Sequence, residues 1–199
     1  MLRSCYHRWQ AVNRKLRKIQ CINNLHQQGL ALHIYLTEFR SYPLWVSPTN
    51  DSSGTWWVQR LAGLQSTNFN FKGVWRCPSG GGDLGYGYNA FGVLKVGNLT
   101  NNFGLLGHSA PHSDSLIPIR ESEVVSPSGM LAIGESDSLA FMRNLGYDFH
   151  GKLRHQSKAN VLFSDGHVES VAQKVLFEDT TDESLARWNR DHKPHRDRS

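Results

Sequence analysis

The sequence predicts an α+β fold, in which one long N-terminal helix packs on a small antiparallel sheet. Residues 5–39 contain no proline and repeat apolar side chains every three or four positions, as a helix does. The later chain alternates short apolar runs with turn-forming residues, as strands do. With 199 residues and 39% hydrophobic composition, the chain supports one modest core. We expect an N-terminal helix over 1–40, a globular α+β domain over 41–177 and a polar C-terminal tail with a short helix over 178–199.

The N-terminal helix is predicted from one stripe of apolar residues at helical spacing. Its members are Trp9, Val12, Leu16, Ile19, Ile22 and Leu25. Beyond Gly29 the apolar density rises, so we expect the part from about Leu25 onward to be more buried than the part before it. Pro43 and the Ser-rich run 47–54 end the helix.

The basic excess of the chain lies on this helix. Residues 1–40 carry seven Lys and Arg and the single acid Glu38, whereas residues 41–177 hold ten of each sign. A solvated helix face explains this pattern, and contact of the basic stem with a membrane surface is the alternative. Nucleic-acid binding is disfavoured because the globular part shows no matching basic face. No apolar stretch reaches the roughly 18–20 residues of a membrane span, and the chain as given shows no export signal.

The remaining elements are expected from apolar runs and turn residues. They are a short amphipathic helix over 55–64, strand-like residues over 69–75 and 86–91, a long loop over 97–117, a buried strand over 130–134, an irregular stretch over 138–154 and a final helix over 182–189. The strongest local signal is Asp165-Gly166 between two apolar runs, which predicts a β-hairpin over 159–172 with a positive φ at Gly166.

Candidate metal ligands come from the ten histidines. His155, Asp165 and His167 are close in sequence and are the candidate ligands of a metal-dependent hydrolase or metal-binding protein. The favoured interpretation is that Asp165 shapes the hairpin turn and His155 makes a structural hydrogen bond. Pro111 argues against a helical metal pair at 108 and 112, and the His-x-x-His at 192–195 is interpreted as part of a solvated tail.

Catalytic motifs are not found. The segment 126–129 lacks the first glycine of a Gly-x-Ser-x-Gly nucleophile turn, and the glycine-rich run 80–85 lacks the lysine of a phosphate loop. We therefore expect no catalytic residue, metal or cofactor. For Trp56 and Trp57, core packing and a binding platform for a sugar or a protein partner both stay open.

The cysteines exclude one class of site. Cys5, Cys21 and Cys77 form no Cys-x-x-Cys pair, so a zinc knuckle or a thioredoxin-type motif is not expected. Three cysteines leave one possible disulfide and one odd thiol.

Several ordered motifs resemble prepilin-type proteins related to the major pseudopilin of type II secretion, in the branch common in planctomycetes and verrucomicrobia. Residues 21–35 resemble the family's helical stem. They are followed by Tyr42-Pro43, Cys77-Pro78-Ser79, Tyr86-Gly87-Tyr88-Asn89, then His155 with nine residues before Asp165-Gly166 and His167, and finally Arg187-Trp188-Asn189 ahead of His192 and His195. The family's processing site and its apolar segment of about 20 residues are not found in the chain as given.

The resemblance implies a pilin-like fold and a non-catalytic structural subunit of a type II secretion or type IV pilus-like assembly. It implies contact with other subunits through the N-terminal helix, and a periplasmic or inner-membrane-associated location. The residues that it marks as structural are His155, Asp165, Gly166, His167, Cys21, Cys77, Pro78 and Asn89. Because Cys21 and Cys77 both fall inside matched motifs, they are the possible disulfide pair. Two buried free thiols are the slightly favoured interpretation, and export of the protein would favour the disulfide.

Overall fold

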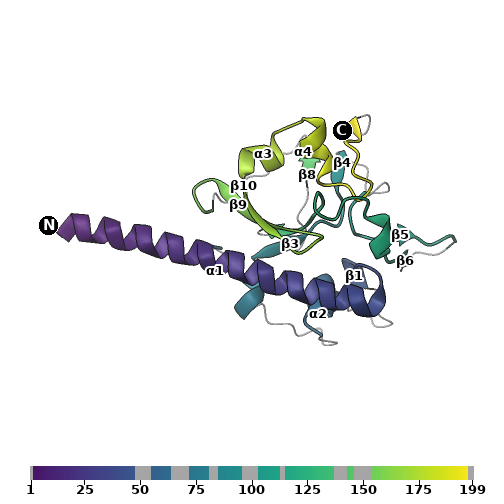
Figure 1. The fold of residues 1–199 in the computed structure, drawn as a ribbon, viewed down its shortest axis with the longest axis horizontal. Helices are drawn as coiled ribbons and strands as arrows, with labels where there is room; N and C mark the ends of the chain where they lie inside the picture. The colour runs from purple at the N-terminus through teal and green to yellow at the C-terminus, as the bar shows by residue number, and fades with distance from the viewer. Residues whose placement is uncertain are drawn as a thin grey trace.

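The structure is a computed structural model that describes residues 2–47, 55–63, 72–80, 85–95, 103–112, 115–136, 143–145 and 154–196. The helices are α1 (Leu2–Phe39), α2 (Trp57–Leu61), α3 (Gln173–Phe177) and α4 (Asp182–Ala186), with 3-10 turns η1 (Gly73–Trp75) and η2 (Glu121–Glu123). The strands are β1 (Val46–Ser47), β2 (Thr55–Trp56), β3 (Tyr86–Tyr88), β4 (Val93–Lys95), β5 (His108–Ser109), β6 (Leu116–Ile117), β7 (Leu131–Glu135), β8 (Arg143–Leu145), β9 (Lys158–Phe163) and β10 (Val168–Ala172). A long N-terminal helix packs on a small antiparallel sheet, so the predicted α+β fold is confirmed (Figure 1).

Four strands form the central sheet in the order β10-β9-β7-β3, with every neighbouring pair antiparallel. β9 and β10 are the predicted hairpin, in which Leu162 pairs with Val168. Gly166 in its turn has a φ of 91°, a left-handed conformation that favours glycine. The register between β7 and β9 shifts at Leu131/Ile133, where the pairing is irregular.

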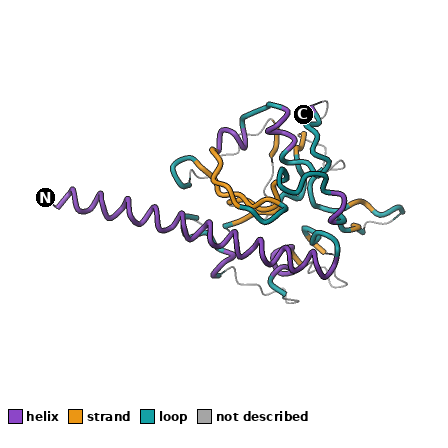
Figure 2. Tube along the Cα trace, in the orientation of Figure 1, coloured by secondary structure: helices purple, strands orange, loops and turns teal. Residues whose placement is uncertain are grey.

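The sheet separates two hydrophobic clusters, because neighbouring side chains of a strand point to opposite faces. Leu162 belongs to the cluster beneath α1, whereas Val161 and Phe163 belong to the cluster with Leu185 and Trp188. Helix α1 lies along one face of the sheet, and α3 and α4 cover the other (Figures 1 and 2). The protein therefore has three layers: helix, sheet and two short helices.

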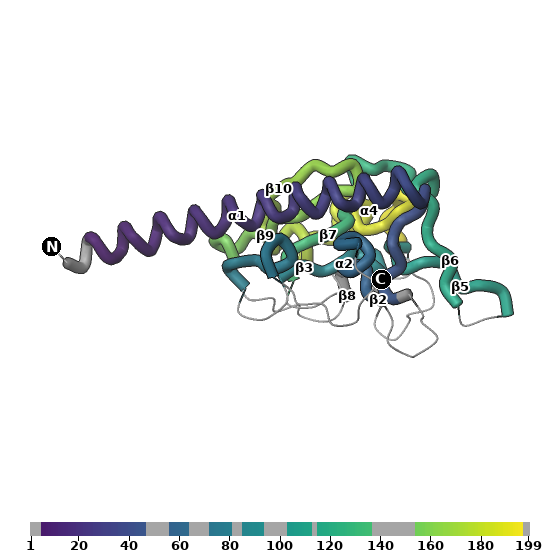
Figure 3. Tube along the Cα trace, turned by 90° about the horizontal axis from the view of Figure 1, so that it is seen from below, coloured from purple at the N-terminus to yellow at the C-terminus, as the bar shows by residue number. Residues whose placement is uncertain are grey.

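Helix α1 is continuous, as predicted, and its two halves differ in burial. Residues 5–20, which we call the stem, are exposed or half-buried throughout and extend beyond the globular part (Figure 3). Residues 21–39, which we call the inner half, hold all of the buried positions described in this helix. These positions are Cys21, Asn24, Leu25, Gln28, Gly29, Leu32 and Leu36. The expected increase in burial along the helix is confirmed.

Polar groups hold the inner half in place. The Asn24 side-chain amide donates to the Arg76 carbonyl at 3.1 Å, and the Gln28 amide donates to the Val74 carbonyl at 2.6 Å. At Gly29 an added Cβ would lie 2.8 Å from Leu162 Cδ1, so a larger residue here would force the buried Leu162 side chain to shift.

Several expected elements are corrected. Residues 73–75 form η1 rather than a strand, because Gly73 adopts a left-handed φ of 60°. The helix expected over 55–64 is shorter, since residues 55–56 pair with β1 as β2. The expected loop 97–117 contains the antiparallel pair β5–β6, and the expected irregular stretch 138–154 contains β8, which pairs with β4 in parallel. Residues 69 and 71, and residues 81–84 of the glycine-rich run, lie outside the described residues.

The C-terminal segment is buried along 184–189 except for the half-buried residue 187, so it is not a tail throughout, whereas His192 is exposed as expected. Helix α4 is shorter than expected and is followed by Trp188 and Asn189, which are both fully buried. The Asn189 side-chain oxygen accepts a hydrogen bond from the Val93 amide at 3.0 Å. The His195 ring stacks on Phe103 with 3.5 Å between the ring centroids. The polar composition of this segment predicts a tail. The segment is nevertheless packed, because its few large apolar residues all face the second cluster.

Candidate functional site

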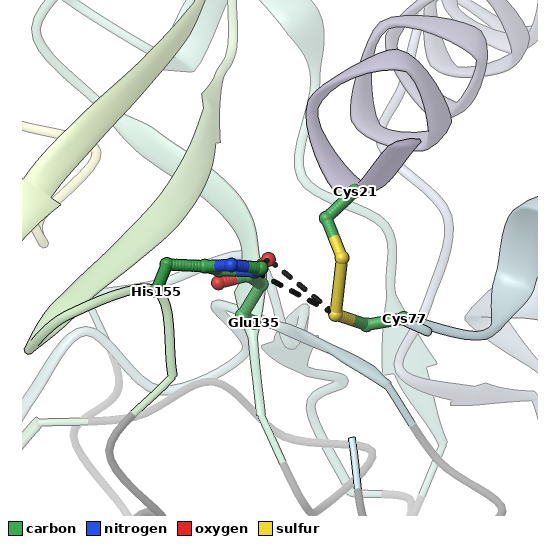
Figure 4. A group of neighbouring side chains, drawn as sticks. All are labelled: Cys21, Cys77, Glu135 and His155. Atoms are coloured by element: carbon green, nitrogen blue, oxygen red, sulfur yellow. Dashed lines mark hydrogen bonds and ion pairs between the residues drawn. A yellow bond between two sulfur atoms is a disulfide. The ribbon is translucent and has the colours of Figure 1, made fainter. Parts of the chain in front are cut away.

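Cys21 of α1 and Cys77, just after η1, are joined by a disulfide (Figure 4). Their Cα atoms are 5.4 Å apart, and both residues are fully buried. Pro78 follows at the second position of a turn that the Gly80 amide closes by donating to the Cys77 carbonyl at 2.9 Å. Cys5 is the exposed free cysteine among the described residues. The disulfide lies where the inner half of α1 begins, and it links the helix to the globular part.

Glu135 and His155 lie against this disulfide. His155 Nε2 is 2.8 Å from Glu135 Oε1, and their side chains are only 2% and 1% exposed. Cys77 Sγ lies 3.5 Å from Glu135 Oε1 and 3.9 Å from His155 Nε2. Glu135 is held further by Asn160, whose backbone amide and side-chain amide donate to its two oxygens at 3.0 and 2.9 Å. The carboxylate is thus oriented by three donors in a buried site.

The turn that carries His155 has an uncommon backbone. His155, Gln156 and Ser157 have φ values of 46°, 61° and 64°, and the Lys158 amide closes the turn on the Arg154 carbonyl at 3.2 Å. Left-handed conformations cost non-glycine residues about 1 kcal/mol or more each and persist only where the surroundings enforce them. The hydrogen bond to Glu135 is one such constraint, and it fixes the imidazole beside the sulfurs.

A cavity of about 480 Å³ lies between this turn and the stem of α1. Its wall on the stem carries Arg14, Lys15, Arg17 and Lys18. Arg154, on the opposite wall, is 5% exposed and donates to the Gly85 carbonyl at 3.1 Å. The cavity is therefore strongly cationic, and it favours negative charge in the buried cluster next to it.

The structure does not bring His155, Asp165 and His167 together. The six-residue strand β9 lies between His155 and Asp165, and at roughly 3.3 Å per residue its ends are about 16 Å apart. Asp165 Oδ1 lies 2.5 Å from His167 Nδ1 in the hairpin turn, and the His167 ring stacks on Phe163. Among the described residues these three do not form a metal-ligand cluster.

Hydrogen bonds from His167 lower the pKa of the Asp165 carboxyl. Partial burial alone would raise the pKa of this carboxyl, but the hydrogen bonds from the His167 backbone and ring together outweigh it, so its pKa lies below the usual value. At the helix, burial raises the pKa of Tyr86, which keeps its hydroxyl protonated to donate to the Cys21 carbonyl at 3.3 Å.

Two other residues marked by the motifs are structural. Asn89 is fully buried, and its side-chain amide donates to the Leu131 carbonyl at 2.7 Å and the Trp188 carbonyl at 2.9 Å. It therefore joins the end of β3 to β7 and to the C-terminal segment. Trp57 is buried and stacks on Tyr88 with 5.3 Å between centroids, which favours core packing over an exposed platform.

The outer face of α1 carries an exposed apolar stripe. Six of its large apolar side chains are each more than half exposed: Trp9, Val12, Leu16, Ile19, Leu30 and Ile34. Leu16 and Ile34 are eighteen residues apart, which is about five turns, so they lie on one face. Leu16 and Leu32 are about 4.4 turns apart, so they lie on nearly opposite faces. The stripe therefore points away from the sheet along both halves of the helix.

A family described as a protein of unknown function (DUF1559) matches residues 10–70. The matched segment covers α1 from Gln10 onward and the first strands and helix after it. This match is consistent with the pilin-like family that the motifs resemble. Comparison with curated proteins and with solved structures gives no match.

Glu135 is the member of the buried cluster that sequence reasoning missed. It directly follows the predicted buried strand 130–134 and is the last residue of β7, and an acid at a strand end indicates a turn as readily as a site. Its partner His155 is twenty residues away in sequence, so only the pairing of β7 with β9 brings the two together.

Proposed function

We propose that this protein is a non-catalytic, pseudopilin-like subunit of a type II secretion or type IV pilus-like assembly. In this assembly, α1 packs against the corresponding helices of other subunits. The apolar stripe on the outer face of α1 is the observation that carries the proposal.

The stripe has the properties of a helix–helix interface. Its residues recur at spacings of three and four from Trp9 to Ile19 and again from Leu30 to Ile34, so they form a ridge in two parts that fits between the side chains of a second helix. This many large apolar side chains exposed on one helix face are uncommon on a protein that acts alone, because large exposed apolar patches mark interaction sites. The polar residues Asn23 and Gln27 interrupt the ridge in its middle, which separates an outer contact in the stem from an inner contact near Leu30.

Other features support the same proposal. The match to residues 10–70 covers most of α1 and is compatible with a pilin-like structural role. A disulfide between Cys21 and Cys77 favours an oxidising compartment such as the periplasm.

We also propose that the basic residues of the stem, which lie mostly off the apolar stripe, contact anionic head groups at the inner-membrane surface. Among the described helices, none has the length and apolar character of a membrane span.

The geometry does not support the alternative of a metal-dependent hydrolase. It needs His155, Asp165 and His167 in one site, and β9 keeps the first of these apart from the other two.

Sedimentation velocity over a range of protein concentrations tests the proposal. We expect the full chain to self-associate as its concentration rises, and Leu16→Glu to shift this association to at least tenfold higher concentration. The reason is that the substitution places a charge inside an apolar contact. Val125→Glu is the matched control, because Val125 is 70% exposed but lies outside α1. A monomer at every concentration, or equal effects of the two variants, would contradict an interface on the stripe.

A further inference from the structure

We propose that Cys21, Cys77, Glu135 and His155 form a binding site for a zinc-like divalent metal ion when the two cysteines are reduced. This site shares only His155 with the trio of His155, Asp165 and His167, and the inference does not depend on the assembly role proposed above.

The donor set fits zinc. The candidate ligand atoms of the four residues all lie within 4.8 Å of one another. Two thiolates, one imidazole nitrogen and one carboxylate oxygen are all common zinc ligands, and four of them complete a tetrahedral site. Cys21 and Cys77 are 56 residues apart, and Glu135 and His155 lie further along the chain. The four ligands therefore form no short sequence motif from which the site could be predicted.

The distances require only small movements. With bonds of about 2.0–2.3 Å, tetrahedral ligands lie about 3.3–3.8 Å from one another. Cys77 Sγ already lies 3.5 Å from Glu135 Oε1 and 3.9 Å from His155 Nε2. The contact of 2.8 Å between His155 and Glu135 would widen by about half an ångström. The two sulfurs separate once the bond between them is broken.

The surroundings of the four residues suit a metal site. Asn160 already orients the Glu135 carboxylate through two hydrogen bonds, as the outer contacts of metal ligands do. The left-handed turn fixes the position of the His155 ring. Two thiolates and a carboxylate around a divalent ion leave one net negative charge, which Arg154 and the cationic wall of the neighbouring cavity would stabilise.

The disulfide and the metal exclude each other. A dithiol reductant transfers two electrons and two protons to the disulfide, so that Cys21 and Cys77 become thiols and the reductant becomes a disulfide. Metal binding then releases both thiol protons to solvent, because the ligands are thiolates, and His155 gives up its Nε2 proton to solvent or to its own Nδ1, so that Nε2 is free to bind the metal. The protein thus has two alternative cross-links between α1 and the globular part, a covalent one and a metal-bound one.

Cobalt titration of the full chain tests the site, because Co²⁺ takes zinc-type positions and reports thiolate ligands through its charge-transfer and visible bands. The chain carries Cys5→Ser to remove the odd thiol and is reduced without oxygen by a phosphine. The phosphine becomes its oxide with an oxygen from water as the disulfide becomes two thiols. We expect one Co²⁺ per reduced chain with tetrahedral bands, displaced by Zn²⁺, and no such bands from the oxidised chain.

The matched variants are His155→Asn and His108→Asn. Each histidine lies beside a glutamate, His108 being 2.5 Å from Glu123, but only His155 is in the cluster. Asparagine tolerates the left-handed φ of position 155. We expect His155→Asn to weaken cobalt binding by at least about tenfold, since losing outer partners alone costs that much. His108→Asn should leave it unchanged.

The rate at which an alkylating reagent modifies Cys21 and Cys77 in the reduced protein gives a second test. In this test all four proposed ligands are kept. Zn²⁺ should slow the modification of Cys21 and Cys77 at least tenfold, and a chelator should restore it. Cobalt bands that are absent from the reduced chain, equal in both redox states or insensitive to His155→Asn would overturn the proposal. Alkylation that Zn²⁺ does not slow would overturn it as well.

Discussion

The two halves of helix α1 share one apolar periodicity but use it in opposite ways. In the inner half, Leu25 and Leu32 are fully buried against the sheet. In the stem, Trp9 and Leu16 are more than half exposed on the opposite side of the helix. The inner half also continues the outer stripe through Leu30, so it is apolar on both sides. The increase in apolar density beyond Gly29 therefore has two sources, the core and an outer surface. Among the described residues, only the core-facing side chains are buried against the rest of the chain.

The largest expected effect concerns the disulfide at the junction of the two halves. Reducing Cys21–Cys77 releases a loop with a sequence separation of 56 residues. The chain-entropy model then predicts a loss of about 4 kcal/mol in the free energy of unfolding. Urea denaturation of oxidised and metal-free reduced chains measures this loss. Cys5→Ser, in the stem, should leave the stability of the oxidised chain unchanged, and an equal loss there would show that the stem is part of the folded core.

A neighbouring pair of leucines compares the two faces of one helix segment. Leu32→Ala should destabilise the protein by about 2–5 kcal/mol, because Leu32 is fully buried. Leu30→Ala should change the free energy of unfolding of the dilute chain by less than about 0.5 kcal/mol, because Leu30 is 64% exposed. Urea denaturation at low protein concentration measures both. Similar losses would mean that Leu30 has a partner within the chain.

The hairpin turn tests how closely the inner half is packed. Gly166→Val should cost on the order of 1–2 kcal/mol, because a β-branched residue resists the φ of 91°. A Cβ at this position would also lie 2.8 Å from His33 Nε2 on α1. Thermal or urea unfolding checks the loss, and a neutral outcome would show that the turn can move away from the helix at no cost.

The smallest expected effect is on pH dependence. The lowered pKa of Asp165 means that its carboxylate stabilises the folded state above its unfolded pKa, near 3.8, and that this contribution is lost as pH falls through the folded pKa. Asp165→Asn should therefore slightly lower the free energy of unfolding above about pH 4 and weaken its decline as pH falls below that value. Unfolding midpoints measured across this range test it. The stem contains no Asp or Glu between residues 5 and 20, so no side-chain carboxyl of the stem adds to this pH dependence of stability.

Local patterns predicted much of this fold. The apolar spacing of α1 and the Asp165-Gly166 dipeptide act over neighbouring residues, and the elements that they predict are present. The strand order and the burial of Trp188 depend on contacts between distant segments, which local patterns do not encode. The same limit applies to the candidate site: His155 was identified as a site residue, but its partner Glu135 is set by strand pairing.

Hydrogen exchange of the full chain at low and high protein concentration tests the central claim, that the outer stripe of α1 is an interface between subunits. Amides of residues 25–36 should be protected at both concentrations, since this segment is packed against the sheet. Amides of the stem should exchange fast in dilute solution and become protected as concentration rises, and Leu16→Glu should abolish that gain while Val125→Glu should not. Stem amides whose protection does not depend on concentration, or a gain that survives Leu16→Glu, would contradict the account.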